Sequence, residues 1–190
     1  MRLTSTRVSP GEKNWELTQD LFVRAFPAEE REPLDELKDP HLQGDFRAFF
    51  IDGEFCGLAY MLMDEINCYL FYLAIEDAMR GKGIGSEILK EIVKLHPNHR
   101  IVLEMETLDP EASNYNDRLR RDRFYRRNGL KHTSVTIEQC EVPYLILSTD
   151  ENYALSDYKE MWKEISIKQG KRGEEIEDYL HHIFGNTLEN

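Results

Sequence analysis

The chain has 190 residues, 41% of them hydrophobic and 32% charged, with a formal net charge of −12. The length fits one domain with a possible appendage, and no apolar run approaches the roughly 20 residues of a membrane span. The acidic balance disfavours nucleic acid and anionic membranes as partners and weakly favours cationic ligands.

The cysteines and histidines predict neither a disulfide framework nor a metal site. Cys56, Cys68 and Cys140 are odd in number and lack CxxC spacing, so we expect reduced core residues in a cytoplasmic protein. The sequence has no signal-peptide core at its start. The six histidines form no metal-ligand pattern, and we expect no metal.

The first third of the chain predicts an edge strand, a helix and an antiparallel meander. Residues 3–8 read as the edge strand, and apolar spacing predicts an amphipathic helix over 14–26. Pro27 is placed to begin a second short helix. Asp52-Gly53 is a strong hairpin signal within the meander. The meander strands are expected at residues 46–51, 54–63 and 68–75.

A glycine-rich loop, Arg80-Gly-Lys-Gly-Ile-Gly-Ser86, follows the last meander strand. Its glycines permit dihedrals that side chains forbid and a close approach of the backbone to a ligand. Apolar spacing predicts a helix over 83–95, whose first N–H groups lack intrahelical partners. Because the helix dipole and the two cations add positive charge, this loop is typical of phosphate binding.

Two well-known nucleotide-binding loops match these residues less well. A P-loop needs four residues between its first glycine and a Gly-Lys-Ser/Thr, and a Rossmann turn reads GxGxxG; this chain has GxGxG. A glycine-rich turn without a ligand is the remaining alternative.

Residues 100–106 (RIVLEME) predict a strand that forms a parallel crossover with strand 68–75. Alternation places Glu104 and Glu106 on the same face. Two carboxylates on a mostly buried strand call for an explanation, and their pairing would raise the pKa of one of them. Alternatively, both face solvent at a frayed strand end or pair with downstream arginines.

An arginine-rich helix is predicted over 115–128, ending in Phe124-Tyr125-Arg-Arg-Asn-Gly129-Leu130. Gly129 stands where a left-handed C-cap is expected. We expect the six arginines of this helix to pair with the surplus carboxylates of the chain.

Two strands, 131–139 and 142–148, are expected to complete the sheet. The tail then shows two apolar helical stripes, separated by a polar hinge at 168–173. Such stripes bury against the body of the chain or against a second subunit, so a homodimer is possible.

The loop and the helix ending together resemble the GCN5-related N-acetyltransferase (GNAT) family. Arg80, Gly83 and Gly85 match its Gln/Arg-x-x-Gly-x-Gly/Ala motif, and the ending resembles Phe-Tyr-x-x-x-Gly-Phe, with Leu130 in place of the last aromatic. Arg118 departs from the family, because many members carry a cofactor-contacting asparagine there. Whether Arg118 or Arg123 contacts cofactor phosphates is left open.

The resemblance implies acetyl-CoA as co-substrate and assigns roles to particular residues. Glu104 matches a position that often serves as general base, and Tyr125 matches a tyrosine near the cofactor sulfur, although it could be only a packed aromatic. The loop after the first helix commonly lines the acceptor pocket, which makes Glu29, Glu30 and Arg31 candidate substrate contacts; a solvated helix start is the alternative. Glu106, on the strand that carries Glu104, is a further candidate substrate contact. The implied cofactor-binding residues are Leu73, Ala74, Ile75, Arg80, Gly81, Lys82, Gly83, Ile84, Gly85 and Ser86.

We therefore expect an α/β fold with a GNAT-like mixed, mostly antiparallel central sheet flanked by helices. Residues 1–149 would form the acetyltransferase domain and 150–190 a helical extension packed on the domain or on a partner subunit. The expected reaction is direct transfer of an acetyl group from acetyl-CoA to a primary amine, either a small cationic amine or a peptide or protein amine. A non-catalytic acyl-CoA-binding sensor is the alternative.

Overall fold

A computed structural model describes residues 2–28, 31–32, 37, 44–139 and 142–184 of the chain. The chain divides into two compact units. The N-terminal unit comprises Met1–Leu62 and Leu70–Pro97, and the C-terminal unit comprises Met63–Tyr69 and Asn98–Asn190. Seven strands in the order β1-β2-β3-β4-β5-β7-β6 form a mixed sheet, and β4 contributes residues to both units. The expected fold class is confirmed.

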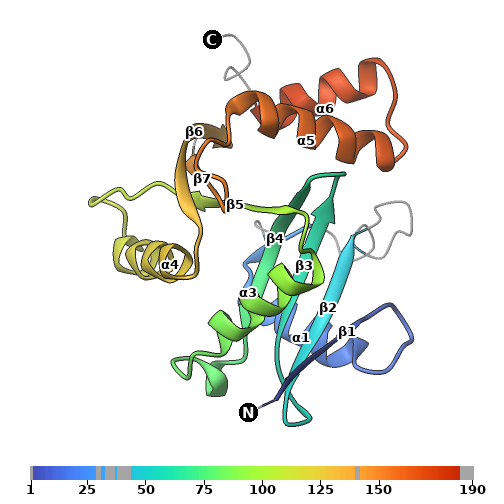
Figure 1. The fold of residues 1–190 in the computed structure, drawn as a ribbon, viewed down its shortest axis with the longest axis vertical. Helices are drawn as coiled ribbons and strands as arrows, with labels where there is room; N and C mark the ends of the chain where they lie inside the picture. Colours follow the sequence, from blue (N-terminus) through green and yellow to red (C-terminus); the bar gives the residue numbers. More distant parts are fainter. Residues whose placement is uncertain (1, 29–30, 33–36, 38–43, 140–141, 185–190) are drawn as a thin grey trace. The chain divides into compact units, whose positions relative to one another are not determined.

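The N-terminal unit contains an antiparallel meander and two helices (Figure 1). Asp52 and Gly53 have φ of 51° and 89°, as the tight turn between β2 and β3 requires. The elements are β1 (Leu3–Arg7), α1 (Trp15–Ala25), β2 (Asp45–Ile51), β3 (Glu54–Met63), β4 (Asn67–Ile75), the short 3-10 helix η3 (Asp77–Met79) and α3 (Ile84–Leu95). All agree with the predicted positions to within one or two residues, apart from η3, which was not expected. The short helix expected at Pro27 falls mostly outside the described residues.

Aromatic side chains form much of the core of this unit. The Phe22 ring of α1 lies edge-on to Tyr72 of β4, with centroids 4.9 Å apart, and 6.1 Å from Phe46 of β2. Such edge-to-face pairs contribute about 0.5–1.5 kcal/mol each beyond the area they bury. These contacts fix α1 against β2 and β4.

Gly57 allows β3 and β4 to approach each other closely. A Cβ atom at this position would lie 2.6 Å from the backbone oxygen of Ala74 on β4 and 3.2 Å from the Ile88 side chain of α3. Real Cβ atoms do not come within 2.6 Å of a backbone oxygen, so the end of β4 can lie this close to β3 only because residue 57 is glycine. Helix α3 in turn buries Ile84, Ile88, Leu89 and Ile92.

The C-terminal unit is built on strand β5 (Arg100–Glu106), which is parallel to residues 67–69 of β4 and antiparallel to β7. The parallel pairing confirms the predicted crossover. In the β5–β7 register, Glu104 lies opposite Ile146. The other elements are α4 (Tyr115–Arg127), β6 (Lys131–Gln139), β7 (Val142–Ser148), α5 (Leu155–Lys168) and α6 (Glu174–Phe184).

Helix α5 packs within the C-terminal unit and is anchored at both ends. At its start, Asp157 accepts hydrogen bonds from Arg100 of β5 at 3.3 Å and from the Ala154 backbone at 2.8 Å. At its end, Lys168 donates to the Met63 carbonyl at 3.2 Å. Figure 1 shows α5 and α6 side by side. None of the helices in the described part of the chain is long and apolar enough to cross a membrane.

Candidate functional site

The glycine loop, residues 80–86, joins η3 to α3 in the N-terminal unit. Gly81 and Gly83 have φ of 75° and 80°, in the left-handed region that favours glycine. A Cβ at either position would meet no atom within 4 Å. The backbone dihedrals, and not crowding within the protein, therefore call for glycine here.

The loop presents a run of backbone donors. The Gly83 carbonyl accepts the N–H of Ser86 at 3.0 Å and of Glu87 at 3.3 Å. Among the described residues, the N–H groups from Gly81 to Gly85 donate to no protein acceptor. Since these donors stand at the positive end of α3, they can bind an anionic group without displacing a protein hydrogen bond.

Two cations accompany these donors. Arg80 is held at the end of β4, where its Nε donates to the Ile75 carbonyl at 3.2 Å and its Nη1 lies 3.0 Å from an oxygen of Asp77. Lys82 is exposed and makes no ion pair with any described residue. The positive charge of Lys82 is therefore available to a ligand on the loop.

The remaining predicted cofactor-binding residues lie just before the loop. Leu73, Ala74 and Ile75 end β4, and Ala74 is the residue whose carbonyl faces Gly57. The structure thus places every predicted cofactor-binding residue within one stretch of the N-terminal unit: the end of β4 and, after η3, the loop and the first turn of α3.

In the C-terminal unit, Glu104 is enclosed by hydrogen-bond donors. The hydroxyl of Tyr69 donates to Oε1 at 2.5 Å, and the hydroxyl of Tyr158 donates to the same oxygen. The Gln139 side chain is a further partner. Burial raises the pKa of Glu104, and the hydrogen bonds from Tyr158, Tyr69 and Gln139 offset part of that rise.

Glu106, on the same face of β5, is neutralised by α4. Its carboxylate lies 3.0 Å from Arg118, forms an ion pair with Arg121 and accepts a hydrogen bond from Asn114 at 3.1 Å. Partial burial alone would raise the pKa of Glu106, but these hydrogen bonds and charges bring it below its usual value.

The two carboxylates are therefore not coupled as expected. We predicted that their pairing would raise the pKa of one member; in the structure, burial raises the pKa of Glu104 instead. For Glu106, the alternative of pairing with downstream arginines is confirmed.

Tyr125 lies on α4, just before the left-handed cap. Gly129 has φ of 94°, and the N–H of Leu130 donates to the Tyr125 carbonyl at 3.2 Å, which confirms the predicted helix ending. The phenol is partly buried, and its hydroxyl bonds to no described residue. Burial raises the pKa of Tyr125, and the charge of Arg121 counteracts the rise in part. No hydrogen bond joins Tyr125 to Glu104 among these residues.

Of the candidate substrate contacts, Glu29 and Glu30 lie outside the described residues. Arg31 is described and partly buried. The next residue, Glu32, donates its backbone N–H to the Tyr72 hydroxyl of β4 at 2.8 Å. The segment at Arg31 is therefore tied to β4 within the N-terminal unit.

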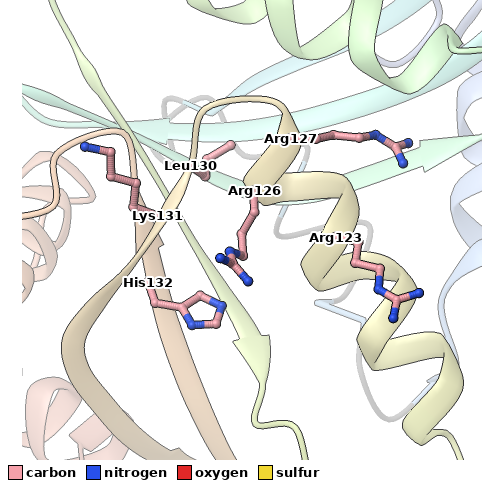
Figure 2. Close-up of a pocket in the computed structure, with 6 residues that line it drawn as sticks. All are labelled: Arg123, Arg126, Arg127, Leu130, Lys131 and His132. Carbon is pink, nitrogen blue, oxygen red and sulfur yellow. The ribbon is translucent and has the colours of Figure 1, made fainter.

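A cationic pocket of about 710 Å³ lies between the end of α4 and the start of β6 (Figure 2). It is lined by Arg123, Arg126, Arg127, Leu130, Lys131 and His132. The buried Asp122 partly neutralises it, through His132 at 2.5 Å and Arg126 at 3.7 Å. The predicted catalytic residues do not line this pocket. Among the described residues, no group of three or more His, Cys, Asp or Glu side chains could hold a metal ion.

Sequence reasoning missed Tyr69 and Tyr158 as partners of Glu104. Tyr158 belongs to an apolar stripe of the tail, and its ring is fully buried as that pattern predicts. The sequence does contain one signal of such a contact: Tyr158 places a hydroxyl on an otherwise apolar helix face, and a buried hydroxyl needs a hydrogen-bond partner. The sequence does not show which partner that is.

Together these features define a class of α/β protein. In it, a glycine loop and a helix connect two parallel strands, and the loop has backbone N–H groups that can bind an anion. The sequence of residues 14–130 matches the family model described as "Acetyltransferase (GNAT) family". Since the match spans more than half of the chain, this protein belongs to the GNAT acetyltransferase family, as the motifs indicated.

Solved structures share this fold. A protein of Bacteroides thetaiotaomicron assigned to the GNAT family is 22% identical with a TM-score of 0.69, and the match covers 96% of this chain and 98% of that one. An aminoglycoside 6'-N-acetyltransferase complexed with coenzyme A is 15% identical with a TM-score of 0.57, covering 76% and 95%. Arabidopsis thaliana Naa50, bound to the bisubstrate analogue CoA-Ac-MVNAL, is 18% identical with a TM-score of 0.58, covering 77% and 97%. Among curated proteins, none matches the sequence significantly.

The matches differ in how much of the C-terminal tail, residues 150–190, they include. The Bacteroides match covers 96% of the chain and so includes most of residues 150–190, whereas the other two cover about three quarters. At these identities the comparison concerns the fold alone. The tail is therefore part of a fold found in another GNAT protein.

Proposed function

We propose that this protein transfers an acetyl group from acetyl-CoA to a primary amine by direct attack of the amine on the thioester. The observation that carries the proposal is the run of N–H groups from Gly81 to Gly85, which have no protein acceptor among the described residues and stand ahead of α3. In this proposal they bind the diphosphate of coenzyme A, with Lys82 and Arg80 contributing positive charge.

The pantetheine arm would run along Leu73 to Ile75, where β4 ends. Two of the structural neighbours support this assignment, since one is complexed with coenzyme A and another with a CoA-containing bisubstrate analogue. Family membership supports it independently.

In the chemical step, the amine nitrogen forms a bond to the acetyl carbon while the carbon–sulfur bond breaks. An ammonium must first lose a proton, and Glu104 is the proposed acceptor. A carboxylate whose pKa burial has raised is a stronger base than an exposed one, provided that it is ionised. Tyr125, whose raised pKa keeps its phenol protonated, would donate a proton to the departing thiolate. The second proton, which the nitrogen releases as the amide forms, would restore the phenol.

The acceptor is proposed only as a class. The net charge of −12 favours a cationic amine over an anionic one. The neighbours span an aminoglycoside acetyltransferase and a protein bound to a peptide-containing analogue, so small amines and peptide amines are both candidates. Glu29, Glu30, Arg31 and Glu106 remain proposed contacts for it. A cytoplasmic location is also proposed, supported by the buried thiols of Cys56 and Cys68.

The test is release of free coenzyme A thiol from acetyl-CoA in the presence of polyamines, aminoglycosides, amino acids and peptides. We expect acceptor-dependent release with at least one of these classes, and calorimetric binding of CoA. Tight CoA binding without turnover on any acceptor would instead indicate an acyl-CoA sensor. Absence of CoA binding would refute the loop assignment.

A further inference from the structure

Helix α5 lies beyond the residues that match the family model, yet it supplies a contact to the proposed base. We propose that Tyr158 is a positioning residue, which holds Glu104 in an ionised and fixed orientation through its hydroxyl. The inference rests on the proposed function, because it assumes that Glu104 accepts a proton during acetyl transfer. It assigns the C-terminal extension a part in the chemistry.

The geometry leaves the Glu104 carboxylate little freedom. Tyr158 is 0% exposed and Tyr69 5% exposed, and both hydroxyls converge on Oε1. The two tyrosines are themselves packed against one side chain: Trp162 lies 6.4 Å from the Tyr158 ring and 5.0 Å from the Tyr69 ring, centroid to centroid. Oε1 is thus fixed from β4 and from α5 at once.

The position of Tyr158 is in turn set by the start of α5. Asp157, the preceding residue, is bonded to Arg100 at the first position of β5 and to the backbone of Ala154. Because Arg100 and Glu104 belong to the same strand, the start of α5 and the Tyr158 hydroxyl are both attached to β5. The helix cannot shift along the strand without breaking these bonds.

Two hydroxyl donors on one carboxylate oxygen favour the ionised form. The titratable groups facing Glu104 are Tyr69 on β4 and Tyr158 on α5, and Gln139 on β6 adds an uncharged donor. Tyr153, just before α5, is a neutral phenol whose own pKa the Glu104 charge helps to raise. Removal of one donor leaves the burial of the carboxylate in place and weakens the ionised form. The pKa of Glu104 then rises further, so the base is lost at a higher pH than in the native protein.

The experiment compares Tyr158→Phe with Tyr153→Phe across the pH profile of kcat/KM. Tyr153 is the matched control, because it is equally buried and its hydroxyl contacts Met161 Sδ at 3.5 Å. We expect Tyr158→Phe to move the ascending acid limb to higher pH, which lowers kcat/KM about tenfold on that limb and much less on the plateau. Tyr153→Phe should leave the limb in place. A purely structural role of Tyr158 would lower the whole profile without moving the limb, and that result would overturn the inference.

A direct titration separates this inference from the proposed function. In protein carrying ¹³C-labelled glutamate carboxyls, the Glu104 resonance is identified by its loss in Glu104→Gln. We expect its titration to move to higher pH in Tyr158→Phe. If the resonance moves but the pH–rate profile does not, Glu104 is not the base and the proposed mechanism fails. If neither moves, the positioning role fails. Should Tyr158→Phe not fold by circular dichroism, Tyr69→Phe removes the other donor and carries the same expectations.

Discussion

The two units of this protein present their candidate chemistry in different ways. The N-terminal unit offers backbone N–H groups from five consecutive residues, Gly81 to Gly85, and its glycines act by having no side chain. The C-terminal unit offers a side chain, Glu104, whose environment comes from β4, β6 and α5. The first kind of site is local in sequence, whereas the second exists only after distant segments have packed.

The largest effect is expected from removing the carboxylate of Glu104, at the centre of the site in the C-terminal unit. Glu104→Gln is expected to lower kcat/KM by about 10²–10⁴-fold and to abolish the ascending acid limb of the pH–rate profile, because the amide cannot accept a proton. CoA affinity should stay unchanged. Glu138→Gln, an exposed position on β6, is the control for a generic loss of charge. Retention of the acid limb in Glu104→Gln would exclude this residue as the base.

The first site is broken by adding a side chain to the loop. Gly83→Val is expected to weaken CoA binding by at least about tenfold, since the branched side chain obstructs the backbone donors and disfavours positive φ. Gly53→Val is the matched control, because Gly53 has a similar φ of 89° but lies in a hairpin. Both variants should lose about 1–2 kcal/mol of stability through backbone strain, and only the loop variant should lose affinity in calorimetry. Equal affinities would contradict the loop assignment.

A smaller effect is expected from Tyr125. Tyr125→Phe removes the proposed proton donor and is expected to reduce kcat about tenfold while CoA affinity changes little. Tyr115→Phe, in the first turn of the same helix, serves as control. Rates equal to the native protein would reduce Tyr125 to a packing role.

The smallest effect concerns Glu106 and is on stability. Because the pKa of Glu106 is lowered in the folded state, its ionised form stabilises the fold above the pKa of the unfolded chain, and that contribution is lost as pH falls through the folded pKa. Glu106→Gln should therefore cost about 1 kcal/mol at pH 7 and much less near pH 3, as measured by urea unfolding. Glu87→Gln removes an exposed ion pair with Lys90 and should cost almost nothing. Equal losses at both pH values would show that Glu106 acts through packing.

The sequence predicts those features that a few consecutive residues determine. Asp52-Gly53 predicts its hairpin and Gly129 its helix cap because the backbone conformation there admits few residue types. The loop is predictable for the same reason. The partners of Glu104 are not, because Tyr69 and Tyr158 lie 35 and 54 residues from it along the chain and carry no local signal of the contact.

Glu106 shows a second limit on what the sequence predicts. Alternation along the strand correctly places it on the same face as Glu104, but the two carboxylates have opposite pKa shifts. The difference arises because the charges of Arg118 and Arg121 reach Glu106. Burial raises the pKa of Glu104, and the two neutral phenols that reach it offset only part of that rise. The alternation of residues along a strand predicts which face each residue lies on, but the surrounding residues determine the pKa of a carboxyl group there.

The contact between Gly57 and Ala74 makes one position of the meander intolerant of any substitution. In a library that samples all twenty amino acids at residue 57, even alanine would push the end of β4 away from β3, because its methyl group would sit 2.6 Å from a carbonyl oxygen. Selection for acetyl transfer in cells should then return glycine alone, although this residue lies outside the loop and carries no chemistry of its own. Because Gly57 has only a hydrogen atom where other residues have a side chain, β4 keeps the position from which the chain continues toward the glycine loop.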